Sequence, residues 1–205
     1  MGKFYVNFSV KSTDQQKMAA VLRDSGRIAI VSPPQSGYVI VYDEETDRQA
    51  LSSIIQVGTL LSESANAPVL AVLNHDDRIL RYWLFEKGAI VDAYDSRPDY
   101  FNKFFLDLNE EDDDEMKEID TTQISRPEKL KDCLKLNLDL VKTKKILRNK
   151  YPSETTRHRA FATELGLPDW SVGVGYYDVP KLQRTIANTK LIDLKGQKFI
   201  YIDNV

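Results

Sequence analysis

The pattern of apolar and polar positions is clearest at the start of the chain. Residues 3–10 alternate strictly, which predicts a β-strand with one buried face. The apolar positions of this strand are Phe4, Val6, Phe8 and Val10. A helical period follows, with a capping-box pattern at Ser12 and Gln15 and a glycine, Gly26, that can end the helix. The chain is therefore expected to begin with a strand and a helix.

The first half of the chain continues this alternation of strands and helices. Apolar runs predict three more strands, at residues 27–31, 38–42 and 69–73. An amphipathic helix capped at Thr46 or Asp47 separates the last two of them, and residues 79–94 predict a β-hairpin with Gly88 at its tip. The order β-α-β-β-α-β is that of the split βαβ unit. The sequence therefore predicts an α+β fold, a ferredoxin-like sandwich extended by a β-hairpin.

Apolar side chains occupy both faces of the later strands. Tyr38, Ile40 and Tyr42 fall on one face of their strand, while Val39 and Val41 fall on the other. Two helices cover only one face of such a sheet, so something else must cover the second. We expect the C-terminal half of the chain to do so, with a symmetric homodimer as the alternative.

The composition changes sharply in the middle of the chain. Nine of the fourteen residues from Asp107 to Asp120 are acidic, which predicts a solvated, mobile loop. We therefore divide the chain into an α+β region at 1–106, an acidic linker at 107–124 and a mainly helical region at 125–205.

The C-terminal region has its own start and stop signals. A helix capped by Ser125 is expected to run from Pro127 to about Lys150, with Leu130, Cys133, Leu134, Leu138 and Val141 along one face. A second helix should start at Ser153, and a short hairpin should close the chain after Leu191.

Composition and charge narrow the classes of partner. The formal net charge is −3, which disfavours nucleic-acid binding except weakly along the basic residues 142–159. A single cysteine, Cys133, is typical of a reducing compartment, so we expect a soluble, cytoplasmic protein. The chain holds no apolar run long enough for a membrane span, and no sequence motif indicates a cofactor.

One turn has the side chains of a metal site. Asn74-His75-Asp76-Asp77 follows a strand, and Asp92 lies in the next hairpin. Imidazole and carboxylate groups are ligands for Mn²⁺, Mg²⁺ or Zn²⁺, so His75, Asp76, Asp77 and Asp92 are candidate metal ligands of a hydrolase or phosphodiesterase. The alternative is ordinary turn chemistry, since these residue types are favoured in turns.

Two further patterns bear on binding. Lys142, Lys144, Lys145 and Arg148 form a basic stretch that is a candidate surface for an acidic protein partner, or simply an exposed helix face. Gly173-Val174-Gly175 lacks the third glycine of a dinucleotide-binding fingerprint and indicates a tight turn.

Three functions fit these observations. A protein-binding or regulatory module is favoured, because the chain has no recognisable catalytic set and its many tyrosines suit interfaces. The alternative is the metal-dependent hydrolase or phosphodiesterase. A third hypothesis is a small-molecule sensor with its site between the sheet and the C-terminal helices.

Overall fold

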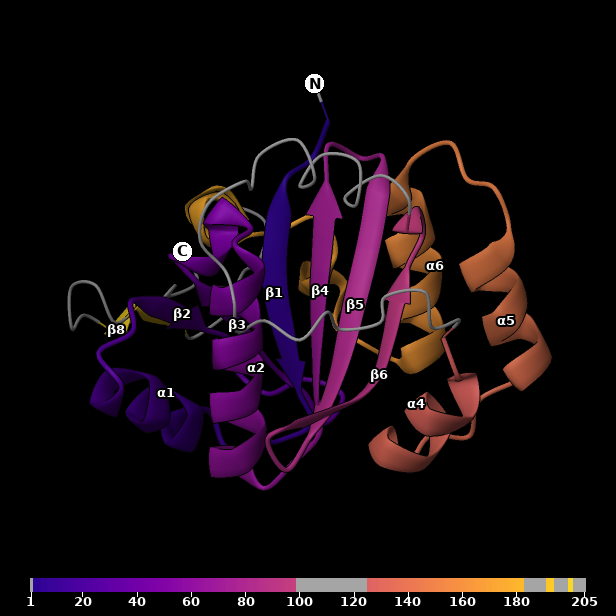
Figure 1. Ribbon diagram of the computed structural model, residues 1–205. Helices are drawn as coiled ribbons and strands as arrows, with labels where there is room; N and C mark the ends of the chain where they lie inside the picture. Colours follow the sequence, from indigo (N-terminus) through magenta and orange to yellow (C-terminus); the bar gives the residue numbers. More distant parts are fainter. Residues whose placement is uncertain (1, 99–124, 183–190, 194–198, 201–205) are drawn as a thin grey trace, which may run out of the picture.

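A computed structural model describes residues 2–98, 125–182, 191–193 and 199–200, which form an antiparallel sheet with helices on both faces (Figure 1). The strands are β1 (Tyr5–Val10), β2 (Ala29–Val31), β3 (Val39–Asp43), β4 (Val69–His75), β5 (Ile79–Glu86), β6 (Ala89–Asp95), β7 (Leu191–Asp193) and β8 (Phe199–Ile200). Their order across the sheet is β6-β5-β4-β1-β3-β2-β7-β8. The α-helices are α1 (Gln15–Asp24), α2 (Leu51–Ala65), α4 (Pro127–Leu134), α5 (Leu140–Arg148), α6 (Glu154–Leu165) and α7 (Val179–Leu182).

One core lies between the sheet and the two N-terminal helices. The alternation of the first strand holds, because Val6, Phe8 and Val10 all pack in this core with α1 and α2. Phe4 does not belong to it: the residue precedes β1, keeps 49% of its surface exposed and packs edge-on against the ring of His75. The strand therefore begins at Tyr5, two residues later than the alternating pattern predicts.

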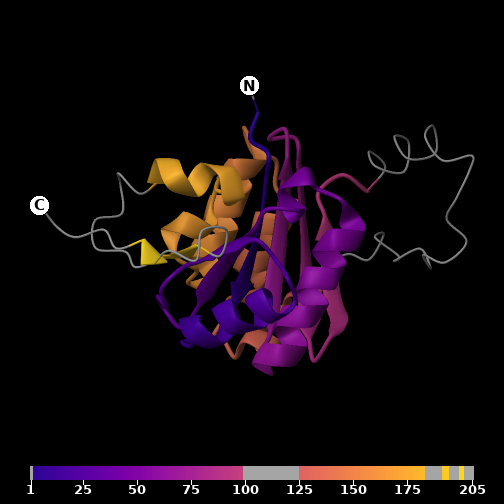
Figure 2. The same cartoon turned by 90° about the vertical axis from the view of Figure 1, so that its left-hand side faces the viewer.

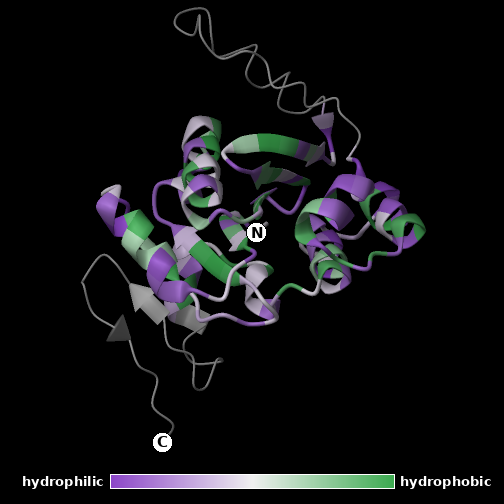
Figure 3. Ribbon diagram, turned by 90° about the horizontal axis from the view of Figure 1, so that it is seen from below, coloured by the Kyte–Doolittle hydropathy of each residue, from purple (hydrophilic) through white to green (hydrophobic). Residues whose placement is uncertain are grey.

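A second core fills the opposite face, as the two-sided pattern of the strands predicts. Tyr38, together with Ile40 and Tyr42 of β3, joins Leu130 of α4 and Phe161 of α6 in a single buried cluster. Figure 2 shows the C-terminal helices (orange) on the side of the sheet opposite α1 and α2. The view from below in Figure 3 shows hydrophobic residues running through the strands between these two layers. The C-terminal half of the chain covers the second face.

Two predicted helix starts are wrong by a few residues. Asp14 caps α1, because its carboxylate accepts a hydrogen bond from the backbone N–H of Lys17 at 2.9 Å. Thr46 begins a short 3₁₀ helix, η1 (Thr46–Arg48), instead of α2. Gln49 then takes a left-handed conformation with φ 65°, so the chain must turn before α2 starts at Leu51.

The long helix predicted from Pro127 to Lys150 is two helices. Lys135 is left-handed with φ 51° and ends α4, and Asp139 caps α5 with hydrogen bonds from the N–H groups of Val141 and Lys142. The break rotates the second helix, which leaves Val141 63% exposed although its spacing predicts burial. Ser125 does not cap α4; its hydroxyl is hydrogen-bonded to that of Tyr82.

The remaining predictions fall partly outside the described residues. Ser153 caps α6 through the N–H of Thr156, and β7 and β8 pair as the expected closing hairpin. The acidic run 107–120 lies outside the described residues. Within them, none of the helices combines the length and the apolar character needed to span a bilayer.

The two-core arrangement predicts the behaviour of a shortened chain. Truncation after residue 106 would strip the cover from the apolar side chains of β3, β4 and β5 on one face. We expect this fragment to aggregate or to bind the dye ANS with loss of near-UV circular dichroism, because so large an apolar patch is unstable in water. A monodisperse fragment with cooperative unfolding would show that the N-terminal half folds alone.

A second prediction concerns a close contact between α2 and the sheet. A Cβ atom added at Gly58 of α2 would lie 2.4 Å from the ring of Phe85 on β5. Gly58→Ala should therefore lower the free energy of unfolding by about 1–3 kcal/mol despite the better helix propensity of alanine. Chemical denaturation measures this, with exposed Gln56→Ala in the same helix as the control, which should change stability by less than about 0.5 kcal/mol.

Candidate functional site

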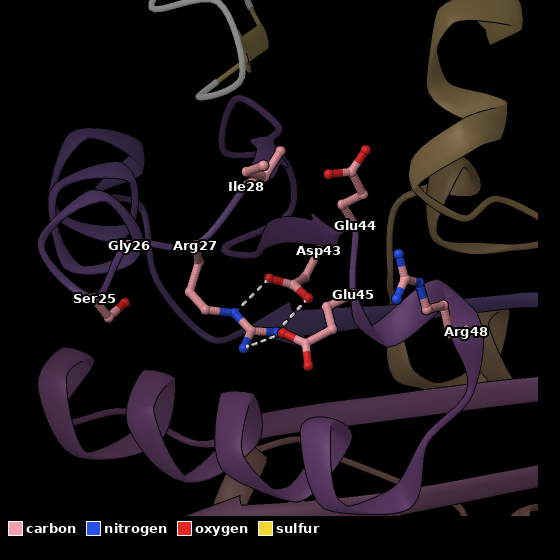
Figure 4. A pocket seen from close by; sticks show the side chains of 8 residues that line it. All are labelled: Ser25, Gly26, Arg27, Ile28, Asp43, Glu44, Glu45 and Arg48. Carbon is pink, nitrogen blue, oxygen red and sulfur yellow. Dashed lines mark hydrogen bonds and ion pairs between the residues drawn. The ribbon is translucent and has the colours of Figure 1, made fainter.

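A pocket opens at the end of the sheet where α1 meets the β2 and β3 strands. Its volume is about 480 Å³. Figure 4 shows the residues that line it, which come from the end of α1, the approach to β2, the end of β3 and η1. The lining consists of Ser25, Gly26, Arg27, Ile28, Asp43, Glu44, Glu45 and Arg48.

One wall of the pocket is a fixed charge cluster. The Arg27 guanidinium donates to both carboxylate oxygens of Asp43, at 2.9 Å and 2.6 Å, and lies 2.9 Å from the carboxylate of Glu45. Asp43 is almost fully buried and also accepts the N–H of Thr46. A bidentate arginine–carboxylate pair of this kind is geometrically rigid. The wall is therefore preformed, and the charge of Arg27 is already neutralised.

The rim carries side chains without such partners. Arg48 is exposed, and its guanidinium forms no ion pair with any residue that the structure describes. Two large apolar side chains also reach solvent here: Ile28 is 39% exposed, and Tyr177, whose hydroxyl donates to Glu44 at 3.3 Å, is 56% exposed. The rim thus combines an unpaired cation, an aliphatic side chain and an aromatic ring.

Asp47 fixes the aromatic part of the rim. Its carboxylate accepts hydrogen bonds from the backbone N–H groups of Val6 at 3.3 Å and Tyr177 at 3.2 Å. Gly175 leaves room for it, because a Cβ atom there would lie 2.4 Å from an Asp47 carboxylate oxygen. Desolvation raises the pKa of Asp47 to about 6, against the hydrogen bonds that lower it. One half-buried carboxylate thus ties the C-terminal segment to η1 and the first strand.

The predicted metal ligands do not assemble into a site. His75 is hydrogen-bonded through Nδ1 to the side chain of Gln49 at 2.6 Å, and Asp76 pairs with Arg78. Asp92 lies on β6 opposite Leu84, where it accepts the hydroxyl of Tyr82 at 2.8 Å. Among the described residues, no group of three or more histidine, cysteine, aspartate or glutamate side chains is placed to hold a metal ion.

Asp77 has a structural task instead. Its carboxylate accepts hydrogen bonds from the side chain of Asn74 and from both the N–H and the hydroxyl of Thr155, while its carbonyl accepts the N–H of Glu154. Asp76 and Asp77 are both left-handed, with φ 54° and 55°. The turn chemistry that the sequence also allowed thus explains these residues, since it fastens α6 to the end of β4.

The basic residues of α5 are either paired with a carboxylate or exposed. Lys142 pairs with Glu164 and Lys144 pairs with Glu128, while Lys145 and Arg148 are exposed. These four residues stay a predicted partner surface. Arg157, from the same basic stretch, is buried; it pairs with Glu154 and donates to the carbonyl of Leu147.

Sequence patterns missed most of the pocket. Arg27 and Asp43 flank the β2–β3 pairing, so a cross-strand charge pair was visible once those strands were assigned. Nothing local marks Tyr177, because it reaches the rim through contacts with residues more than 120 positions away.

The raised pKa of Asp47 gives a pH dependence with a definite sign. Its pKa is about 6 in the folded chain and near 3.8 unfolded, so its contribution to stability is greatest below pH 4 and is lost as pH rises to 6. Asp47→Asn should remove this part of the pH profile. Urea denaturation of both proteins between pH 4 and 7 measures it, and parallel profiles would contradict the assignment.

Comparisons with known proteins place the chain in no family. No protein-family model matches it, and no curated protein and no solved structure shows a significant similarity to it. Its function has to be argued from the geometry and charge of the residues described above.

Proposed function

We propose that this chain is a protein-binding, regulatory module whose docking surface is the pocket between α1, β2 and β3. The observation that carries the proposal is the exposure of three side chains at the rim: Arg48 and Ile28 line the pocket, and Tyr177 is hydrogen-bonded to the lining residue Glu44. Tyrosine and arginine are the residue types that most often dominate the binding energy of protein interfaces. An exposed arginine near an aliphatic and an aromatic side chain suits a partner segment that carries a carboxylate and apolar groups.

The preformed wall supports binding as well. Because Arg27, Asp43 and Glu45 already hold one another, a partner would not have to order them, which lowers the entropic cost of association. The lining includes carboxylates, but Asp43 and Glu45 are already paired with Arg27, so we favour recognition by the pocket over acid–base chemistry.

The proposal includes the fold of the first half of the chain and the cellular location. We interpret the first half of the chain as ferredoxin-like, supported by the strand order β4-β1-β3-β2 and by α1 and α2 packing on one face. A single cysteine and the many charged residues suit a cytoplasmic protein whose partner is another protein.

The test compares two exposed arginines. The partner is first captured on the full-length chain, purified, and its affinity measured by calorimetry. Arg48→Glu and Tyr177→Ala should each weaken binding by about 2 kcal/mol, near thirtyfold, because both remove a rim anchor. Arg148→Glu on α5 is the matched control and should leave the affinity unchanged. If Arg148→Glu abolishes binding while Arg48→Glu does not, the basic face of α5 is the docking surface and the pocket is not.

A further inference from the structure

Exposed apolar side chains gather at one end of the sheet. In the part of the chain that the structure describes, the exposed large hydrophobic residues are Phe4, Ile28, Val141 and Tyr177. Val141 lies on α5. Phe4 leads into β1, Ile28 leads into β2, and Tyr177 lies at the pocket rim. Because β1 and β2 each run antiparallel to β3, both begin where β3 ends, so these three side chains share the end of the sheet that holds the pocket.

Phe4 is joined to η1 through a series of contacts. Its ring packs edge-on against the His75 ring, with the two ring centroids 4.9 Å apart. His75 is hydrogen-bonded through Nδ1 to the side chain of Gln49, the residue that follows η1. The side-chain amide of Gln49 also donates to the carbonyl of Asn74 at 2.8 Å. Both contacts of Gln49 hold the end of β4, and with it the Phe4 ring, next to η1.

Tyr177 is joined to the same short helix from the pocket side. Its backbone N–H donates to Asp47 of η1, and its ring packs edge-on against the Tyr176 ring with the centroids 5.1 Å apart. Its hydroxyl donates to Glu44, whose backbone N–H donates to the carbonyl of Ile28 at 2.9 Å. One series of contacts therefore runs from Ile28 through Tyr177 and η1 to the residues that hold the Phe4 ring.

Arg48 is the charged group that this end of the sheet leaves available. It lies in η1 and is exposed, and its guanidinium has no ion-pair partner in the described ranges. The carboxylates nearby, those of Glu44, Glu45 and Asp47, already accept hydrogen bonds from groups of the same chain. A carboxylate of a partner is therefore the group that complements Arg48.

The strand order sets the size of the surface. Phe4 leads into β1 and Ile28 leads into β2, and β3 lies between these two strands. Two strand spacings are about 10 Å, a distance that about three residues of extended chain cover. The rings of Phe4 and Tyr177 are already packed against neighbouring rings, which reduces the entropy lost when a partner orders them.

We propose that the docking surface extends from the pocket across η1 to Phe4, and that it binds a short acidic segment of another protein. A carboxylate of this segment binds the Arg48 guanidinium, and one of its apolar side chains packs on Phe4. A second apolar side chain, about three or four positions away in the segment, packs on Tyr177 and Ile28. This extension rests on the docking role proposed for the pocket and adds to it the chemistry of the partner and a second apolar contact.

Peptide selection on the full-length chain tests the surface and the partner chemistry together. The probe is a phage library of random dodecapeptides, and the affinities of the enriched peptides, made synthetically, are measured by fluorescence anisotropy. The enriched sequences should share an Asp or Glu flanked by apolar residues. Phe4→Ala should weaken their binding about tenfold, the usual cost of removing an anchoring side chain. Phe4→Tyr keeps the ring and should bind like the wild type.

Val141→Ala is the matched control. Val141 is even more exposed than Phe4 but lies on α5, so its truncation should leave the affinities unchanged. Phe4→Ala should still fold, because Phe4 precedes β1 and lies outside both buried clusters.

The variants separate a failure of the extension from a failure of the pocket itself. If Arg48→Glu and Tyr177→Ala weaken the selected peptides but Phe4→Ala does not, docking is confined to the pocket and the extension is wrong. If none of the three variants weakens them, the docking role of the pocket is wrong as well. No enrichment, or enriched peptides that lack an acidic residue, would overturn the proposed partner.

Discussion

The fold depends on burying both faces of a single central strand. All six residues of β1 are buried, with α1 and α2 on one side and the C-terminal half on the other. Each face of the sheet owes its stability to apolar area removed from water, at roughly 25 cal/mol per Å². Neither cover is therefore optional, and α6 is part of the second one.

Periodicity predicted the elements well and their ends poorly. The strict alternation of residues 3–10 gave β1, and the two-sided apolar pattern of β3 gave the second core. The predicted helix boundaries are wrong where a single residue takes a left-handed backbone conformation, as Gln49 and Lys135 do. Such residues are not glycines, so no local signal marks them. New helices then start at Leu51 and at Leu140.

The candidate sites were harder to predict because their members are distant in sequence. The side chains of the Asn74–Asp77 turn suggested a metal site. In the structure, however, the Asp77 carboxylate accepts a hydrogen bond from Thr155, 78 positions later in the chain. In contrast, Asn7 and Ser9 looked like the solvent face of an alternating strand and are fully buried. A polar residue in an alternating strand indicates solvent exposure only when one face of the sheet is left uncovered. Here the C-terminal half closes that face, which turns an ordinary surface pattern into a buried polar stripe.

The contacts of Asn7 also govern how the chain can be made. Its side chain bonds to carbonyls 164 and 167 residues later, so the second core cannot close until Ser171 and Val174 have left the ribosome. Until then the nascent sheet holds an uncovered layer of tyrosine and aliphatic side chains. Contacts of such long range also slow folding, because the entropy cost of loop closure comes before the favourable packing contacts form. During synthesis this polypeptide should accordingly be a client of chaperones that shield apolar β-surfaces.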